Sequence, residues 1–142
     1  MSTHVMKQPR EIRAAFQKHW ASVSGGKFKA PNRPPKNPTE MTVWTYRGPG
    51  KIRRDGFSTF RGQYISDFLV ISAAKAVNNL DEIERIAFQA AQSLTDNMPT
   101  ELRGGIDSII DVDISDILEF SNANGKGPRY YGFRLTINVI HR

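Results

Sequence analysis

Residues 130–142 read YYGFRLTINVIHR, and this stretch decides the fold because its apolar and polar side chains alternate. Side chains along a strand point to opposite faces with a period of 2, so a half-buried strand shows this alternation. The apolar residues of one face and the polar residues of the other are Phe133, Leu135, Ile137 and Val139 against Arg134, Thr136 and Asn138. The stretch therefore predicts a strand with one face in the core and the other in water.

Three earlier stretches also have the composition of strands. TEMTVWTYR (39–47) is short and alternating, whereas QYISDFLVISAA (63–74) is more continuously apolar and is expected at the centre of the sheet. In IDSIIDVDISDILEF (106–120) the alternating sets are Ile110, Val112 and Ile114 against Asp111, Asp113 and Ser115. SNANGKGP then predicts the turn into the strand over 130–142.

Two amphipathic helices are predicted, because apolar residues recur at intervals of three and four. In REIRAAFQKHWASV (10–23), Pro9 suits the first turn and Gly25-Gly26 the end. In the second helix, Asn79 can cap the N-terminus, where acidic residues also suit the helix dipole. The apolar stripes are Ile12, Ala15, Phe16, His19 and Val23 in the first helix, and Leu80, Ile83, Ala87, Ala91 and Leu94 in the second.

Together these elements predict a two-layer α+β fold, in which two helices pack on a four-stranded, largely antiparallel or mixed sheet in the order α-β-β-α-β-β. Residues 1–142 are expected to form a single domain with a flexible N-terminal tail over 1–8, a Pro-rich connection over 31–38 and a long basic loop over 47–63. The expected core is shared by Ile83, Ala87, Leu94, Ile110, Val112, Ile114, Phe133, Leu135, Ile137 and Val139.

The composition is that of one ordinary globular domain. The chain has 142 residues, and 39% of them are hydrophobic, which is enough for a real core. Because the sequence has no cysteine, disulfides and thiolate metal sites are excluded. No signal-peptide pattern is evident, and no stretch approaches the roughly 20 apolar residues that span a bilayer. We therefore expect neither export nor a membrane partner.

The net charge of +6 conceals two halves of opposite sign. Residues 1–63 contain 13 Lys and Arg against 3 acids, whereas residues 64–142 contain 7 against 11. Separated charges of this kind serve nucleic-acid contact or subunit pairing between opposite patches. Solvated loops that happen to be basic give the same pattern, so charge alone leaves three interpretations open.

Residues suited to catalysis lack their usual companions. His4, His19 and His141 have no metal-like or triad-like neighbours in the sequence, so a structural or incidental role is expected. The segment GPGKI lacks the Ser or Thr that follows GK in a phosphate loop. Asp111 and Asp113 share a strand face and could form an acid/base pair or a hard-cation site, but a solvated face is favoured. We expect no enzyme activity, metal or cofactor.

The segment KIRRDGFSTFR (51–61) interleaves cations with aromatic residues. Nucleic-acid-binding surfaces have this composition, because cations hold phosphates and aromatic rings stack on bases. The signatures of RNA-recognition and KH modules are missing, and arginine and aromatic residues are equally enriched at protein interfaces. A mobile loop over 48–62, ordered only against a partner, is therefore expected. Its candidate contact residues are Lys51, Arg53, Arg54, Phe57, Phe60 and Arg61.

The order, size and local composition of these elements resemble the tail-terminator proteins of long-tailed bacteriophages, the lambda-like minor tail protein U group. The likeness covers nearly the whole chain and rests on the segments IRAAF, EMTVWTY, QYISDFLVIS, NLDEIERIA and YYGFRLTINVIH, without an invariant motif. The Pro-rich connection and the basic loop are not assumed for the family, so the resemblance does not imply their contacts.

The resemblance implies a structural virion protein, assembled in the host cytoplasm and located at the head–tail junction. Such a protein forms a homo-hexameric ring, caps the tail tube, stops its polymerisation and joins the head–tail connector or neck protein, with genomic DNA in the pore. Further candidate interface or pore residues are Asp111, Asp113, Asp116 and Arg134. Two alternatives stay open: another ring component of the junction, such as a neck or tail-completion protein, or a basic nucleic-acid-binding module.

Overall fold

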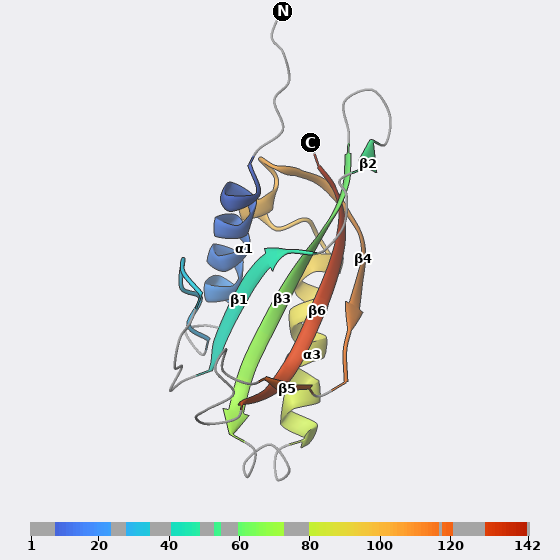
Figure 1. Cartoon of the computed structure of the whole chain (residues 1–142). Helices are drawn as coiled ribbons and strands as arrows, with labels where there is room; N and C mark the ends of the chain where they lie inside the picture. Colours follow the sequence, from blue (N-terminus) through green and yellow to red (C-terminus); the bar gives the residue numbers. More distant parts are fainter. Residues whose placement is uncertain are drawn as a thin grey trace, which may run out of the picture.

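The computed structural model describes residues 8–23, 28–34, 41–48, 53–54, 60–72, 80–116, 118–120 and 130–141. These residues form one antiparallel sheet with two helices packed on one of its faces (Figure 1). The predicted α+β class, with two helices on a sheet, is confirmed. Several predicted features lie outside the described residues: the tail over 1–7, the glycines at 25–26, residues 35–38 of the Pro-rich connection, the cap at Asn79 and the turn over 121–128.

The chain contributes its strands to the sheet in a non-sequential order. The elements are α1 (Pro9–Val23), β1 (Thr42–Arg47), β2 (Arg53–Arg54), β3 (Phe60–Ser72), α3 (Leu80–Thr95), the 3-10 helix η1 (Thr100–Leu102), β4 (Ile106–Ile114), β5 (Leu118–Phe120) and β6 (Tyr130–His141). The long strands lie in the order β1-β3-β6-β4, while β2 pairs with β3 and β5 pairs with β6. The four predicted strands are present, β3 is central as expected, and two short strands extend the sheet.

The basic loop predicted over 47–63 is shorter than expected. Arg47 is the last residue of β1, β3 already begins at Phe60, and β2 lies between them. The amide of Gly48 still donates to the carbonyl oxygen of Gln63 at 2.8 Å, so the pairing of β1 with β3 continues past the end of β1. The segment is rich in glycines and cations and its apolar residues show no regular spacing, which suggested a loop. Backbone amide and carbonyl groups pair whatever the side chains are, however, so the polar end of a strand can still belong to the sheet.

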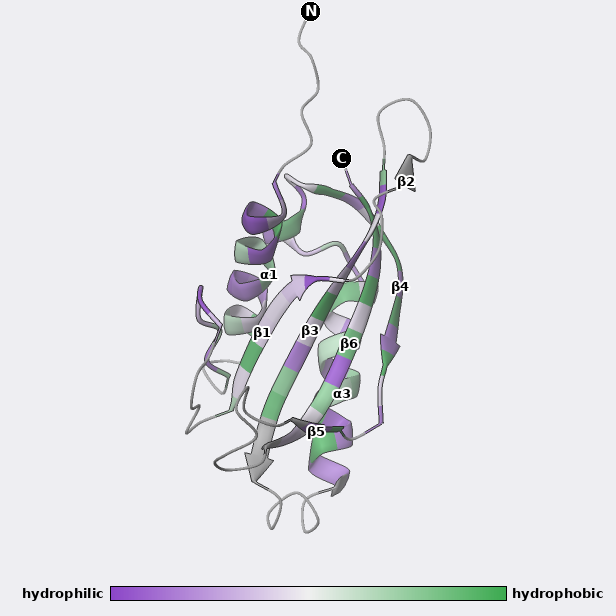
Figure 2. Cartoon of the chain, in the orientation of Figure 1, coloured by the Kyte–Doolittle hydropathy of each residue, from purple (hydrophilic) through white to green (hydrophobic). Residues whose placement is uncertain are grey.

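The inner face of β6 is buried as its alternation predicts. Its apolar side chains are at most 1% exposed, whereas the intervening polar ones are partly exposed: Phe133, Leu135, Ile137 and Val139 against Arg134, Thr136 and Asn138. The ring of Phe133 stacks on Phe68 of β3 with 4.6 Å between centroids. Figure 2 shows the alternation of hydrophobic and hydrophilic residues along β3 and β6. The predicted register of β6 is confirmed.

β4 departs from the predicted alternation at Ile110, which is 43% exposed rather than part of the core. The pairing of β4 with β6 shifts its register between Ile109 and Asp111. A β-bulge inserts one residue without an opposite partner and bends the strand. Ile110 is therefore left at the surface, and Ile109 packs against the core in its place. Val112 and Ile114 also pack against the core, as predicted.

The two helices bury most of their predicted apolar stripes. Ile12 and Phe16 of α1, and Ile83 and Leu94 of α3, are at most 2% exposed and belong to the same core as β6. The prediction for Val23 was wrong, because this side chain is 45% exposed. It lies in the last turn of α1 and borders an open hollow instead of packing on the sheet.

A buried hydrogen-bond network joins α1 to the sheet. Gln17 Nε2 donates to the carbonyl oxygen of Val43 at 2.8 Å, and Gln17 Oε1 accepts from Thr45 Oγ1 at 2.9 Å. Trp20 Nε1 donates to Ser66 Oγ at 3.1 Å. Paired polar groups in a core favour one arrangement, since any other would leave them unsatisfied. The network thus fixes α1 over β1 and β3.

Two histidines are buried, His19 in α1 and His141 in β6. His19 Nε2 lies 3.0 Å from Ser93 Oγ, and His19 Nδ1 lies 3.9 Å from Glu101 Oε2. Within the described part of the chain, Nδ1 of His141 has no hydrogen-bond partner. Burial lowers the pKa of both imidazoles, and the negative charge of Glu101 opposes this effect at His19. Both side chains are packed in the fold, as the expected structural role requires.

These lowered pKa values predict that the protein loses stability in mild acid. In the unfolded chain a histidine has a pKa of about 6.5, so unfolding takes up protons below that pH. The free energy of unfolding should be constant above about pH 7 and fall below about pH 6.5, by up to about 1.4 kcal/mol per pH unit for each histidine. Urea denaturation between about pH 8 and pH 5 measures this slope. The variant His141→Leu should show a smaller slope, and equal slopes would contradict the prediction.

Candidate functional site

The predicted basic segment is described in part, and that part is a pair of antiparallel strands. Lys51 and Phe57 lie outside the described residues. Arg53 and Arg54 form β2 and pair with Arg61 and Phe60 at the start of β3. The structure therefore brings four of the six predicted contact residues together, on the strand pair β2 and β3.

The predicted acids lie together on the other side of the sheet. Asp111 and Asp113 are exposed on β4, and Asp116 is exposed just after it. Asp111 Oδ1 accepts a hydrogen bond from Asn138 Nδ2 at 2.6 Å, and Asn138 Oδ1 accepts from Gln63 Nε2 at 3.3 Å. A chain of polar contacts thus crosses from β4 over β6 to β3. Within the described residues no three His, Cys, Asp or Glu side chains are grouped so that they could hold a metal ion.

Arg134, the last predicted interface residue, pairs within its own subunit instead of joining the acids of β4. Its Nε donates to Asp67 Oδ1 at 2.7 Å, and Tyr46 Oη donates to Asp67 Oδ2 at 2.9 Å. Burial, with the Asp67 carboxylate, raises the pKa of Tyr46 to about 12, so the phenol stays protonated and donates. Sequence reasoning did not predict this cluster. The signal for it was Asp67 itself, the one carboxylate in the otherwise largely apolar stretch over 63–74, because a carboxylate in such a stretch needs a partner. The cluster ties β1, β3 and β6 together.

Two groups of described charged residues, one basic and one acidic, lie at opposite edges of the sheet, while other charged side chains such as Arg61, Arg85 and Arg134 lie elsewhere. The basic flank consists of Arg10, Arg13, Lys29 and Arg33, and the acidic flank consists of Asp107, Asp111, Asp113, Asp116 and Glu119. The basic residues belong to α1 and to the segment 28–34, which runs beside β1, whereas most of the acids lie on or next to β4. Because β1 and β4 are the two ends of the strand order, the flanks lie on opposite sides of the sheet (Figure 1).

The basic flank contains a shallow hollow of about 280 Å³ between α1 and Asn32. Arg10 and Arg13 line it one helical turn apart, together with Glu11, Ala14 and Gln17 of the same helix. The guanidinium carbon of Arg13 lies 5.1 Å from the ring centroid of Trp44, a cation–π contact that restrains this cation. The walls are largely the aliphatic parts of side chains, while the guanidinium groups provide positive charge. The hollow therefore suits an apolar side chain that has acidic neighbours.

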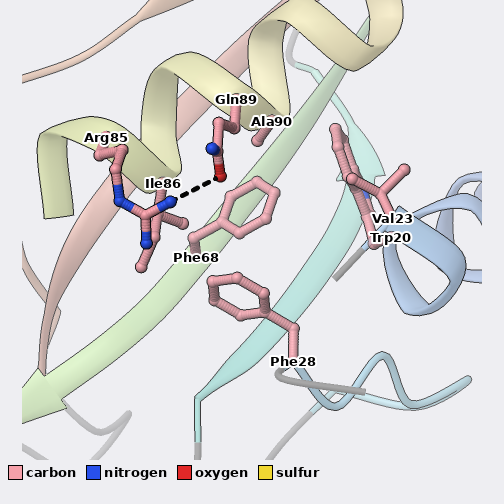
Figure 3. A pocket seen from close by; sticks show the side chains of 8 residues that line it. All are labelled: Trp20, Val23, Phe28, Phe68, Arg85, Ile86, Gln89 and Ala90. Carbon is pink, nitrogen blue, oxygen red and sulfur yellow. Dashed lines mark hydrogen bonds between the residues drawn. The ribbon is translucent and has the colours of Figure 1, made fainter. Parts of the chain in front are cut away.

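A second hollow, of about 100 Å³, opens between the end of α1, α3 and the sheet (Figure 3). Phe28 and Phe68 lie next to each other in its lining, edge to face, with 5.3 Å between ring centroids. Arg85 is the charged residue of its lining, and it already bonds with Glu82 and Gln89 of the same helix. The lining contains no acid/base pair, so this hollow is a gap in the packing beneath an exposed helix.

Sequence reasoning placed the basic contact at residues 51–61, whereas the structure shows further cations on α1 and the 28–34 segment. Arg10 and Arg13 were counted in the basic half of the chain, but the helix packing is what leaves Arg10 exposed and Arg13 partly exposed on α1. Neither described helix is long and apolar enough to cross a membrane. No protein-family model matches the sequence, and a search of curated proteins found no match either.

Proposed function

We propose that this protein is a tail-terminator subunit of a long-tailed bacteriophage. In this proposal it is a structural virion protein that forms a homo-hexameric ring at the head–tail junction. The ring caps the tail tube, stops its polymerisation and offers a joining surface to the head–tail connector or neck protein. The observation that carries the proposal is the division of charge between the basic flank and the acidic flank, on opposite sides of one sheet.

This division supports a ring because of the symmetry that a ring requires. In a ring each subunit uses one patch against its first neighbour and a different patch against its second neighbour. Two patches of opposite charge at opposite ends of a sheet attract each other between copies and leave room for both neighbours. A binding or catalytic cleft, by contrast, would gather its polar groups at one place.

Tube capping is the experiment that tests the proposed function. Six copies of the 16.0 kDa chain weigh about 96 kDa, so native mass spectrometry should detect a species of that mass. Added to the tail-tube protein of the same virus as it polymerises, the ring should shorten the tubes and appear at one of their ends in electron micrographs. Unchanged tube lengths would contradict the terminator role. Rings that bind the connector but not the tube would favour a neck or tail-completion protein.

Nucleic-acid binding is the second candidate, because the basic flank combines cations of α1 with cations of the 28–34 segment, which α1 contacts through the bond from Gln17 Nε2 to the carbonyl oxygen of Pro31. If cations there neutralise phosphates, affinity for DNA should fall steeply with salt concentration. Binding to duplex DNA measured at two salt concentrations tests this candidate. A monomer that binds DNA in a salt-dependent way would replace the terminator proposal, whereas a ring that binds DNA would be consistent with DNA in the pore.

A further inference from the structure

We propose that the acidic flank of one subunit docks on the basic flank of a second copy, with Ile110 inserted into the hollow between α1 and Asn32. This inference rests on the proposed self-assembly and names the surfaces that meet. Its occupant is a second copy of this chain, because the two flanks have opposite charge and belong to the same sequence.

Ile110 is an apolar side chain displayed among acids. It is 43% exposed at the bulge of β4, and Asp107, Asp111 and Asp113 are exposed on either side of it along the strand. A single exposed isoleucine needs no explanation, but a bulge that turns a β-branched residue away from the partly buried face of a strand re-aims that side chain. The surrounding acids prevent this residue from attracting apolar surfaces without a complementary charge.

The hollow of the basic flank has the matching properties. Its volume of about 280 Å³ and its open shape admit a branched aliphatic side chain, with Ala14 at its lining and the stems of Arg10 and Arg13 as walls. A docked isoleucine would lose contact with water, and its flanking carboxylates would lie beside the two guanidinium groups. Glu11 also lines the hollow, but its carboxylate already accepts a hydrogen bond from the amide of Gln8.

The position of the two surfaces lets every copy make both contacts at once. β1 and β4 are separated by two strands, and adjacent strands lie about 4.8 Å apart. The edge of β1 is already paired in part with Lys29, whose carbonyl oxygen accepts from the amide of Val43 at 2.9 Å. The bulges of β4 likewise oppose continuous pairing with another strand. Contact between copies therefore uses side chains rather than one sheet extended through the ring.

Paired charge reversals test this interface in the purified full-length protein. One variant, Arg10→Glu with Arg13→Glu, replaces the two cations that line the hollow with acids, and the other, Asp107→Lys with Asp113→Lys, replaces two of the acids beside Ile110 with cations. Sedimentation velocity should show that each variant alone associates at least about 100-fold more weakly than the wild type, because like charges then face each other. An equimolar mixture of the two variants should recover assembly, since every contact between unlike variants again joins opposite charges. The matched control, Asp81→Lys with Glu84→Lys on exposed positions of α3, should assemble normally.

A third variant, Ile110→Ala, tests the apolar contact separately and should weaken association by about tenfold without altering its salt dependence. Rings that persist in both reversal variants would overturn this interface while leaving the proposed tube capping intact. A mixture that stays monomeric although the wild type forms rings would also overturn it. A wild type that remains monomeric would instead contradict the proposed ring itself.

Discussion

Leu135→Asp should leave the protein unable to fold. Leu135 is fully buried at the centre of the sheet, between β3 and β4 on the inner face of β6. Removing such a side chain as far as alanine costs about 2–5 kcal/mol, and a buried, unpaired carboxylate adds a further penalty. The sum is comparable to the about 5–15 kcal/mol that stabilises a typical domain. Circular dichroism in urea should show no cooperative transition for this variant.

The neighbouring residue provides the control for this prediction. Thr136 is the next residue of β6 but lies on the outer, partly exposed face of the sheet. Leu135→Ala should lower the free energy of unfolding by about 2–5 kcal/mol, whereas Thr136→Ala should lower it by about 1 kcal/mol or less. Equal losses at the two positions would mean that the register of β6 is wrong by one residue.

Gly132→Ala should have a comparably large effect through the backbone. A Cβ atom at Gly132 would overlap the carbonyl oxygen of Phe68 on the adjacent central strand. Since that oxygen belongs to the backbone of β3, relief requires β3 and β6 to separate where their register already shifts, beside Leu69. We expect a loss of about 3 kcal/mol or more in the free energy of unfolding, the range that distortion of a packed core produces.

Gly48→Ala is the matched control for the glycine substitution. A Cβ atom at Gly48 would also meet a neighbour too closely, but that neighbour is the end of the Gln63 side chain. A long side chain at a partly exposed position changes rotamer at little cost, so Gly48→Ala should change stability by less than about 1 kcal/mol. If thermal denaturation gives the two variants the same midpoint, the close approach at Gly132 does not constrain the sheet.

The sequence predicts this fold well where side-chain alternation and backbone pairing agree. β6 is uninterrupted, and every apolar residue from Phe133 to Val139 lies where period 2 places it. β4 has the same alternation in sequence, yet Ile110 is exposed because a bulge changes the count of residues along the strand. No side-chain pattern indicates a bulge, since it arises from how the backbone of one strand meets its partner.

The candidate site is predictable in its charge but not in its geometry. Unequal numbers of cations and acids in the two halves of the chain indicate two charged patches. Their position on opposite flanks depends on the strand order β1-β3-β6-β4, which places the late strand β6 between two earlier ones. Arg134 shows the same limit: its charge suggested an interface, but its partner Asp67 is 67 residues away in the sequence.

The place of β6 in the sheet also has a consequence for synthesis on the ribosome. β3 and β4 both pair with β6, which is made after each of them. Until residues 130–141 have left the exit tunnel, the nascent chain lacks the strand that unites its two halves. The acidic strand β4 therefore lacks its pairing with β6 during elongation, and neighbouring nascent chains on one messenger RNA do not yet present the finished form of the proposed docking surface. Strand order would thus delay the proposed association between copies until each copy has folded.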